Sequence, residues 1–197
     1  MTSHLSQWIL AALLLACLAS FAWAMRAFFV QPAGATKGMR ITGACGTISA
    51  ILHISAIALA QRVPFGRAAA ASAFYAAALT LFWWAVSTNR RKALSAIFSP
   101  DLPVHIVIEG PYRYVRHPLY SAYVMTWLAG EIATLKWWLV PTIVVMAAIY
   151  MRAAKAEEAK FLRSGLAASY DEYRSRTGRF VPAPWKIFGA KRSPEAR

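Results

Sequence analysis

The sequence predicts an all-α integral membrane protein with about five transmembrane helices. Hydrophobic residues make up 58% of its 197 positions, and only 15% are charged, against about 25% in a typical soluble domain. Lys and Arg outnumber Asp and Glu by 22 to 8. These figures disfavour an ordinary soluble enzyme or an acidic disordered chain. A nucleic-acid binder would scatter its cations among its helices, whereas here they are excluded from long apolar runs, so no nucleic-acid partner is expected.

Five apolar stretches reach or approach the ~20 residues that a helix needs to cross a bilayer. They cover residues 5–30, 41–60, 68–87, 119–135 and 137–151. The first has no basic residue before Arg26 and exceeds the length of a signal-peptide core, so a retained helix is favoured over a cleaved signal. The last two are short and separated by Lys136, which predicts a tight helical hairpin. The fifth is expected to continue beyond the membrane as a charged helix.

The basic residues between these stretches predict the orientation. With five crossings, the loops after the first and third stretches share one side with the C-terminus, and that side holds 19 of the 22 Lys and Arg residues. The other side holds three: Arg62, Arg67 and Lys136. The positive-inside rule therefore puts the C-terminus and the third loop in the cytoplasm. Basic flanks also attract anionic head groups, so membrane lipids are expected partners.

The expected organisation has three parts. Residues 1–100 hold three transmembrane helices and their loops. Residues 101–185 hold a polar loop that is the candidate for catalysis, the fourth and fifth transmembrane helices and a cytoplasmic helix. Residues 186–197 form a polar tail predicted to be disordered. Cys17 and Cys45 lie inside apolar segments without the spacing of a metal site, so they are interpreted as small buried thiols and no metal is expected.

Two polar segments on the predicted cytoplasmic side carry the candidate chemistry. The first is residues 104–120, in which alternation from His105 to Glu109 suggests a short extended piece. Gly110-Pro111 predicts a turn, and His117-Pro118 predicts the start of a helix with proline in its first position. Backbone N–H groups at a helix start, next to an imidazole and tyrosine rings, can hold an anionic or aromatic ligand. The residues alone leave open that this loop only anchors the protein at the head-group level.

The second segment runs from Arg152 to Tyr173. Helical spacing puts Glu157 and Phe161 on one face, and Glu158 and Leu162 on another. A charged helix leaving a membrane is often only a solvated face, and an Arg at the boundary, such as Arg152, is often a snorkelling anchor. In isolation this segment therefore does not indicate a site.

Together the two segments resemble a known family. Gly110-Pro111-Tyr112-x-x-x-Arg116-His117-Pro118-x-Tyr120 is followed about 37 residues later by Glu157-Glu158 and then by Tyr170-x-x-Tyr173. This pattern, over residues 104–182 or about 40% of the chain, is similar to the isoprenylcysteine carboxyl methyltransferase family, which itself resembles the phospholipid N-methyltransferases. Residues 1–100 match only as a set of membrane helices.

The resemblance implies an integral-membrane methyltransferase that uses S-adenosylmethionine. The cofactor contacts that it implies are His105, Ile106, Val107, Tyr112, His117, Pro118, Leu119, Tyr120 and a glutamate of the pair Glu157-Glu158. It also implies that Arg152 faces the substrate, so Arg152, Glu157 and Glu158 are the candidate catalytic residues. Ser164-Gly165 stands where the family has Phe-Gly, and Gly165 is further from Tyr170 than usual, which leaves both glutamates as candidates.

The chemistry of methyl transfer suits these groups. The reaction is an in-line displacement at a sulfonium carbon, so positioning can supply much of the rate. A carboxylate acceptor is already ionised and needs a cation, which Arg152 could provide in a bidentate way. A glutamate can meet the amino group of the cofactor, and helix-start N–H groups its carboxylate. An amine or thiol acceptor would instead need His117 or a glutamate as a base.

The leading hypothesis is methylation of the carboxylate of a lipophilic, isoprenylcysteine-like acceptor that enters from the bilayer. A phospholipid N-methyltransferase or a small-thiol S-methyltransferase is the alternative within the same class. A non-catalytic membrane protein is the second alternative. It would require polar residues within the membrane helices, for which His53 and Ser55 are modest candidates.

Overall fold

In a computed structural model the chain is described over residues 2–27, 29–30, 36–89, 94–95, 103 and 105–185. Within these residues the elements are α1 (Thr2–Ala27), β1 (Phe29–Val30), α2 (Lys37–Ala58), α3 (Phe65–Asn89), β2 (Leu94–Ser95), the 3₁₀ helix η1 (Gly110–Arg113), α4 (Pro118–Thr134), the 3₁₀ helix η2 (Trp137–Leu139), α5 (Val140–Leu162) and α6 (Ala167–Arg176). The all-α class is thereby confirmed, with two short paired strands added. The predicted polar tail and residue 104 of the first polar segment lie outside the described residues.

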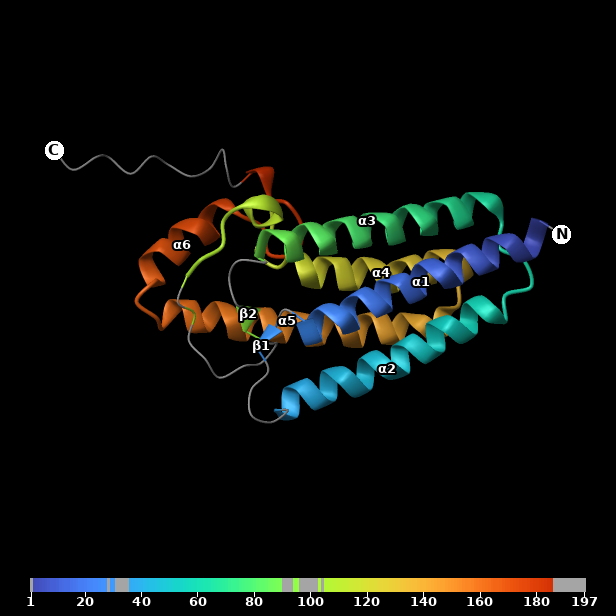
Figure 1. The fold of residues 1–197 in the computed structure, drawn as a ribbon, viewed down its shortest axis with the longest axis horizontal. Coiled ribbons are helices and arrows are strands. Elements are labelled where there is room, and N and C mark those ends of the chain that lie inside the picture. Colours follow the sequence, from blue (N-terminus) through green and yellow to red (C-terminus); the bar gives the residue numbers. More distant parts are fainter. Residues whose placement is uncertain are drawn as a thin grey trace.

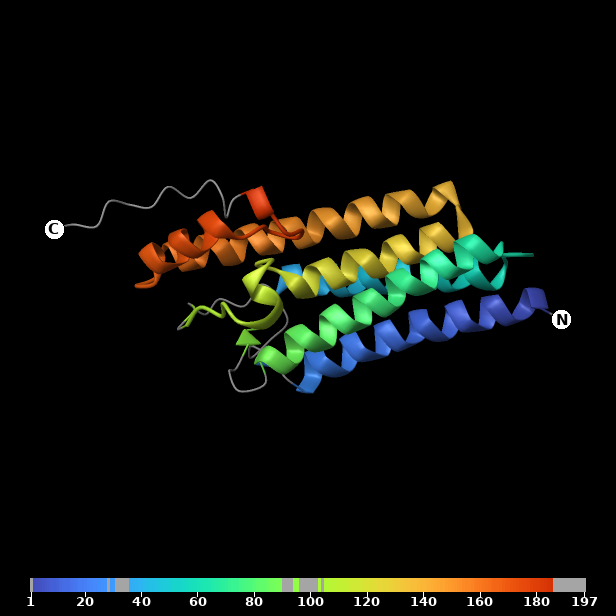
Figure 2. The same ribbon diagram turned by 90° about the horizontal axis from the view of Figure 1, so that it is seen from above.

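The five long helices α1 to α5 run alternately in opposite directions along one axis (Figures 1 and 2). One end of this bundle carries the N-terminus, the α2–α3 connection and the α4–α5 turn, and is called the far end below. The opposite end, called the site end, carries η1, α6 and the parallel strand pair β1–β2 (Figure 1). Five long helices of alternating direction match the order that the sequence predicts, and four of them have the length and hydropathy of a membrane span.

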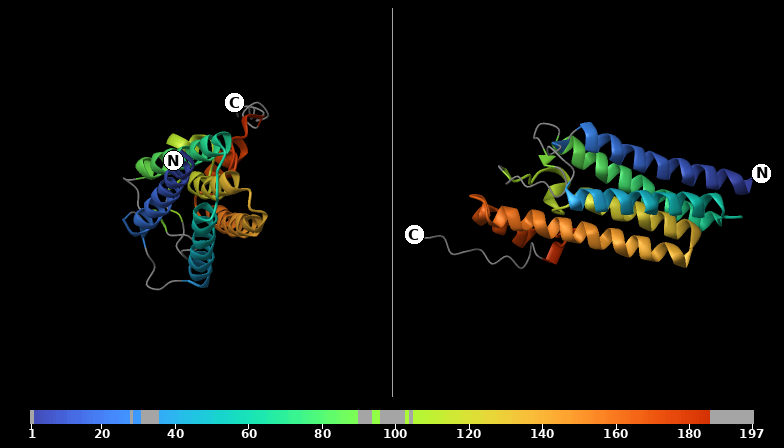
Figure 3. Two further views of the ribbon diagram at one scale, coloured as in Figure 1. Left: turned by 90° about the vertical axis from the view of Figure 1, so that its right-hand side faces the viewer. Right: turned by 90° about the horizontal axis from the view of Figure 1, so that it is seen from below.

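Four helical stretches of the described chain are long and apolar enough to span a membrane. They are Leu5–Ala27, Lys37–Ala58, Phe65–Asn89 and Trp137–Leu162. The fourth predicted crossing, α4, has 17 residues, which at 1.5 Å per residue gives about 25 Å, less than a hydrocarbon core of about 30 Å. It contacts all four other long helices and lies between α3 and α5 when seen along the bundle axis (Figure 3). The short helix is thus the centre of the bundle.

Small residues let these helices approach one another closely. Ala71, Ala78 and Ala85 repeat every seven residues along α3 and are fully buried, so they lie on one face of the helix. Tyr75 and Phe82 fill the spaces between them and are also fully buried. Of the two cysteines, Cys17 is buried in the core and Cys45 is half-buried, and both are free thiols.

The predicted turns are confirmed at both ends of α4. Pro118 is its first residue and His117 is its N-cap. At the far end Leu135 adopts φ 49° and caps α4, after which η2 leads directly into α5. Gly110 has φ +56°, and a Cβ there would overlap Thr88 of α3, so the turn into η1 requires glycine. The fifth predicted helix continues unbroken to Leu162, which carries Glu157 and Glu158 to the site end.

Candidate active site

At the site end, the carboxylate of Glu158 gathers three basic side chains. Arg116 Nε donates to its Oε1 at 3.0 Å, and His117 Nε2 lies 3.2 Å from the same oxygen. Arg179 binds in a bidentate way, with Nε 3.0 Å from Oε1 and Nη2 2.7 Å from Oε2. The side chains of Glu158 and Arg116 are only 5% exposed. We call these four residues the Glu158 clamp, and it joins α5 to the start of α4 and to the segment after α6.

Backbone and side-chain hydrogen bonds fasten that segment along the start of α4. The backbone N–H of Arg116 donates to the carbonyl of Gly178 at 2.9 Å, and that of His117 to Arg179 at 3.0 Å. The Ser121 hydroxyl donates to the carbonyl of Phe180 at 2.6 Å. The segment after α6, residues 178–180, is therefore held by hydrogen bonds beside His117, and it is called the strap below.

A cavity of about 680 Å³ opens next to the clamp, a volume within the usual range of sites for small molecules and cofactors. Its wall at the site end is polar and aromatic. The residues of this wall are Asn89, His105, Tyr112, Arg116, His117, Tyr120, Glu157, Lys160, Phe161, Tyr170 and Tyr173. Asn89 Nδ2 donates to the Tyr112 hydroxyl at 2.7 Å, which fixes the tyrosine against the end of α3.

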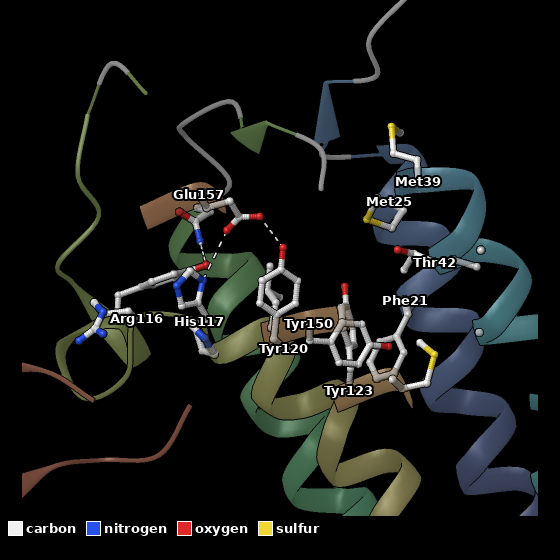
Figure 4. Close-up of a pocket in the computed structure, with 18 of the residues that line it drawn as sticks. Phe21, Met25, Met39, Thr42, Arg116, His117, Tyr120, Tyr123, Tyr150 and Glu157 are labelled. Carbon is white, nitrogen blue, oxygen red and sulfur yellow. Dashed lines mark hydrogen bonds and ion pairs between the residues drawn. The ribbon is translucent and has the colours of Figure 1, made fainter. Parts of the chain in front are cut away.

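Glu157 and Glu158 are neighbours in the sequence but occupy different environments. Successive residues on an α-helix point about 100° apart, so Glu157 lines the cavity while Glu158 lies in the clamp. Glu157 accepts a hydrogen bond from the Tyr120 hydroxyl, and its Oε2 lies 3.4 Å from His117 Nδ1. His117 thus bridges the two glutamates, one through each ring nitrogen. Figure 4 shows its contact with Glu157.

This position determines the charge of His117. Burial by itself lowers the pKa of the imidazole, but hydrogen bonds and charges from Glu157 and Glu158 outweigh that effect and hold the pKa above its ordinary value. The protonated ring can donate to both carboxylates, whereas the neutral ring can donate to only one. The charged form is therefore the one that the two glutamates stabilise.

The cavity continues from the polar wall into an apolar branch between α1 and α2. The α1 residues are Leu18, Phe21, Ala22 and Met25, and the α2 residues are Met39, Thr42, Gly43, Gly46, Thr47, Ala50, Ile51 and Ile54. Tyr120, Tyr123 and Tyr150 lie between the ionic residues and this branch (Figure 4). A Cβ at Gly46 would only reach van der Waals contact with Met146, at 3.8 Å, and one at Gly43 would meet nothing within 4 Å, so the glycines keep the branch open.

The structure brings most of the residues singled out in the sequence to one place. Nine of them line the cavity: His105, Ile106, Val107, Tyr112, His117, Pro118, Leu119, Tyr120 and Glu157. Glu158 lies behind His117 and outside the cavity lining. Arg152 is exposed and is not part of the lining either, because it follows Tyr150 by two residues and so points about 200° away from it.

Sequence reasoning missed the clamp partners and the apolar branch. Arg116 stands inside the quoted motif, and its place directly before His117 was the available signal. Nothing in the sequence around Arg179 indicated a role in the site, because only the fold brings this residue to Glu158. The spacing of Gly43, Gly46 and Ala50 along one helix face could have indicated an open groove on α2.

Comparison with known proteins adds one finding. A family model described as phospholipid methyltransferase matches residues 65–168, more than half of the chain. The match runs from the start of α3 to the start of α6, so it includes His117 and Glu157 but not α1, α2 or Arg179. No curated protein and no solved structure gave a significant match.

The substitution Glu158→Gln should destabilise the protein by about 3–5 kcal/mol, because it leaves the buried Arg116 without a counter-charge. The free energy of unfolding in detergent measures the effect. Glu172→Gln is the matched control, since it removes an exposed pair with Arg176 (Nη2–Oε1 2.6 Å) and should cost at most about 0.5 kcal/mol. Equal losses in the two variants would contradict a structural role for the clamp.

Stability should also depend on pH through His117. Because its pKa is higher in the folded than in the unfolded chain, its contribution is fully present below the ordinary value of 6.5 and is lost as the pH rises through the folded-state pKa. We expect Tm to fall over this range, and to fall less in His117→Gln, which cannot titrate there. Thermal unfolding of both proteins from acidic to alkaline pH tests this, and parallel profiles would refute it.

Proposed function

The chain belongs to the phospholipid methyltransferase family, and we propose that it is an S-adenosylmethionine-dependent membrane methyltransferase acting on a lipophilic acceptor. One observation carries this proposal. A single cavity joins a polar wall with Glu157 and His117 to an apolar branch between two helices that are long enough to span a membrane. A charged cofactor and an apolar acceptor can thus meet in one space.

The polar wall fits S-adenosylmethionine by the chemistry of its groups. The Glu157 carboxylate suits an amino group. The N–H groups of Leu119 and Tyr120 suit a carboxylate, because they lie in the first turn of α4, where they have no intrahelical acceptor. Aromatic side chains of the wall, such as Phe161 and Tyr170, offer apolar faces for a purine. When bound, the cofactor supplies an electrophilic methyl group on a sulfonium.

The tyrosines between the two parts of the cavity suit the transfer itself. Tyr120 and Tyr150 are stacked, with ring centroids 5.5 Å apart and planes 10° apart. Tyr123 lies beside both of them. Aromatic faces attract cations, so this cluster can hold a sulfonium centre at the junction with the apolar branch. Positioning there, rather than acid–base chemistry, would supply most of the rate for an acceptor that is already ionised.

Among the candidate catalytic residues, we assign the cofactor contact to Glu157. Glu158 is assigned a positioning role, because it fixes His117, which in turn contacts Glu157. Arg152 is exposed and outside the cavity lining, so its proposed contact with the substrate has no support from the geometry. If the acceptor is a carboxylate, Lys160 is a cation of the cavity wall that can meet it, since Arg116 is already held by Glu158.

Two acceptor classes fit the apolar branch. A lipophilic carboxylate, as in an isoprenylated cysteine, needs a cation and no base, which agrees with Lys160 on the wall. A phospholipid amine, the acceptor class that the name of the matching family suggests, must lose a proton. His117 is a poor base because both of its ring nitrogens face glutamates, so Glu157 would take that role. A small thiol would leave the apolar branch unused.

We further propose that the site end faces the cytoplasm. The two loops at this end and the C-terminal segment carry all the Lys and Arg residues except Arg62, Arg67 and Lys136. The positive-inside rule places such a side in the cytoplasm.

Cofactor binding is the first test. The purified protein should bind S-adenosylhomocysteine in calorimetry. Glu157→Gln should weaken binding about tenfold or more, as expected for the loss of a charge-assisted hydrogen bond. Arg152→Gln is the control on the same helix and should bind as the wild type does. Absence of binding to the wild type would overturn the proposed function.

The acceptor is tested separately. Gly46→Leu should reduce kcat/KM for long-chain acceptors by about tenfold or more by filling the apolar branch, with S-adenosylhomocysteine affinity unchanged. Gly66→Leu, at an exposed site with nothing within 4 Å of a Cβ, is the control. With labelled cofactor, base-labile label on a farnesylated cysteine identifies a carboxylate acceptor, whereas base-stable label on lipid identifies an amine. Equal kinetics in both variants would contradict an acceptor site between α1 and α2.

A further inference from the structure

A second pocket, of about 530 Å³, lies at the far end of the bundle. Three connected regions form it: the chain after α2, the first turn of α3 and the end of α4. Its lining is Leu59, Ala60, Gln61, Arg62, Arg67, Ala133, Thr134 and Lys136. The three Lys and Arg residues of the far end, two in its connections and Arg67 in the first turn of α3, all line this one pocket. Two separate loops therefore direct their cations to the same place.

These cations have no counter-charge within the described residues. No ion pair joins Arg62, Arg67 or Lys136 to a carboxylate of that part of the chain. Glu131, one turn before the end of α4, does not line the pocket. By contrast, basic side chains at the site end pair with Glu158, Asp171 and Glu172. The far-end cations are thus available to an anion from outside the described chain.

The helix ends do not supply that charge. α2 and α4 end beside the pocket, and each contributes about half a negative charge, while α3 and α5 begin at the same end and each contribute about half a positive charge. These partial charges cancel, which leaves three full positive charges around a solvent-accessible space.

Exposed apolar residues stand within a few positions of the pocket's cations in the chain, and together they are called its apolar rim. Leu59, Phe65, Leu135 and Trp137 are 77%, 89%, 62% and 80% exposed. They flank the cations at the end of helices that are long enough to span a membrane, where such side chains face the boundary between head groups and acyl chains. A ligand for this site therefore combines an anionic head with apolar chains.

We propose that this pocket binds the phosphate-bearing head group of an anionic phospholipid, in the leaflet opposite to the active site. The phosphate lies among Arg62, Arg67 and Lys136, with the Gln61 amide as a further donor, and the acyl chains lie against the apolar rim. Cations near a membrane surface favour anionic lipids strongly enough that three of them correspond to about a hundredfold preference over a zwitterionic head group. This inference does not depend on methyl transfer.

Lipid-dependent thermal unfolding of the full chain in detergent tests the proposal. Phosphatidylglycerol at a hundredfold excess over its Kd should raise Tm by about 5–10 °C, and phosphatidylcholine should raise it much less. The triple variant Arg62→Gln/Arg67→Gln/Lys136→Gln should lose at least half of the phosphatidylglycerol shift. The control Lys155→Gln/Arg163→Gln/Arg176→Gln removes the same number of positive charges at the site end. It should keep most of the rise in Tm that phosphatidylglycerol causes.

If phosphatidylglycerol raises the Tm of the far-end triple variant as much as that of the wild type, the proposal is overturned. It is also overturned if only the control variant loses this rise in Tm. Inorganic phosphate and glycerol phosphate are tested in a separate experiment. If either raises Tm as much as phosphatidylglycerol does, the pocket binds a free anion instead of a lipid. If the triple variant does not fold, the exposed residues are changed singly. Arg62→Gln and Lys136→Gln should each weaken phosphatidylglycerol binding about fivefold, and unchanged affinity in both refutes the site.

Discussion

The arrangement of the site end depends on the buried carboxylate of Glu158. A buried anion is costly unless it is fully paired, and this one is paired by residues from the start of α4 and from the strap after α6. Meeting that requirement fixes how α5, α4 and the strap lie relative to one another. It also orients His117, whose second ring nitrogen then faces Glu157. Glu158 lies outside the cavity lining, yet it determines the geometry of His117 and Glu157, which are part of that lining.

The cavity combines two chemistries that come from different parts of the chain. The polar wall is built by residues within the matched family region, whereas much of the apolar branch is built by α1 and α2, which lie outside it. Substitutions on α1 and α2 can alter the apolar branch without touching the clamp. The two parts of the cavity are therefore built by separate segments of the chain.

Charge is distributed very differently at the two ends of the bundle. At the site end, carboxylates on α5 and α6 neutralise part of the basic charge, and the strongest pairing is buried. At the far end, three cations surround one pocket without such partners among the described residues. The site end therefore contains a buried ionic cluster around Glu158, whereas the cations of the far-end pocket have no ion pair within the described residues.

The sequence by itself determined the helical class, the hairpin around Lys136, the helix start at Pro118 and the polar segments of the site, because hydrophobic runs, proline and turn residues act locally. It did not determine that α4 is the short centre of the bundle, since burial by neighbours cannot be read from one segment. Nor did it separate Glu157 from Glu158, place Arg152 outside the cavity or bring Arg179 to the clamp. These depend on the rotation of α5 and on the path of the chain after α6, which only the packing of distant segments decides.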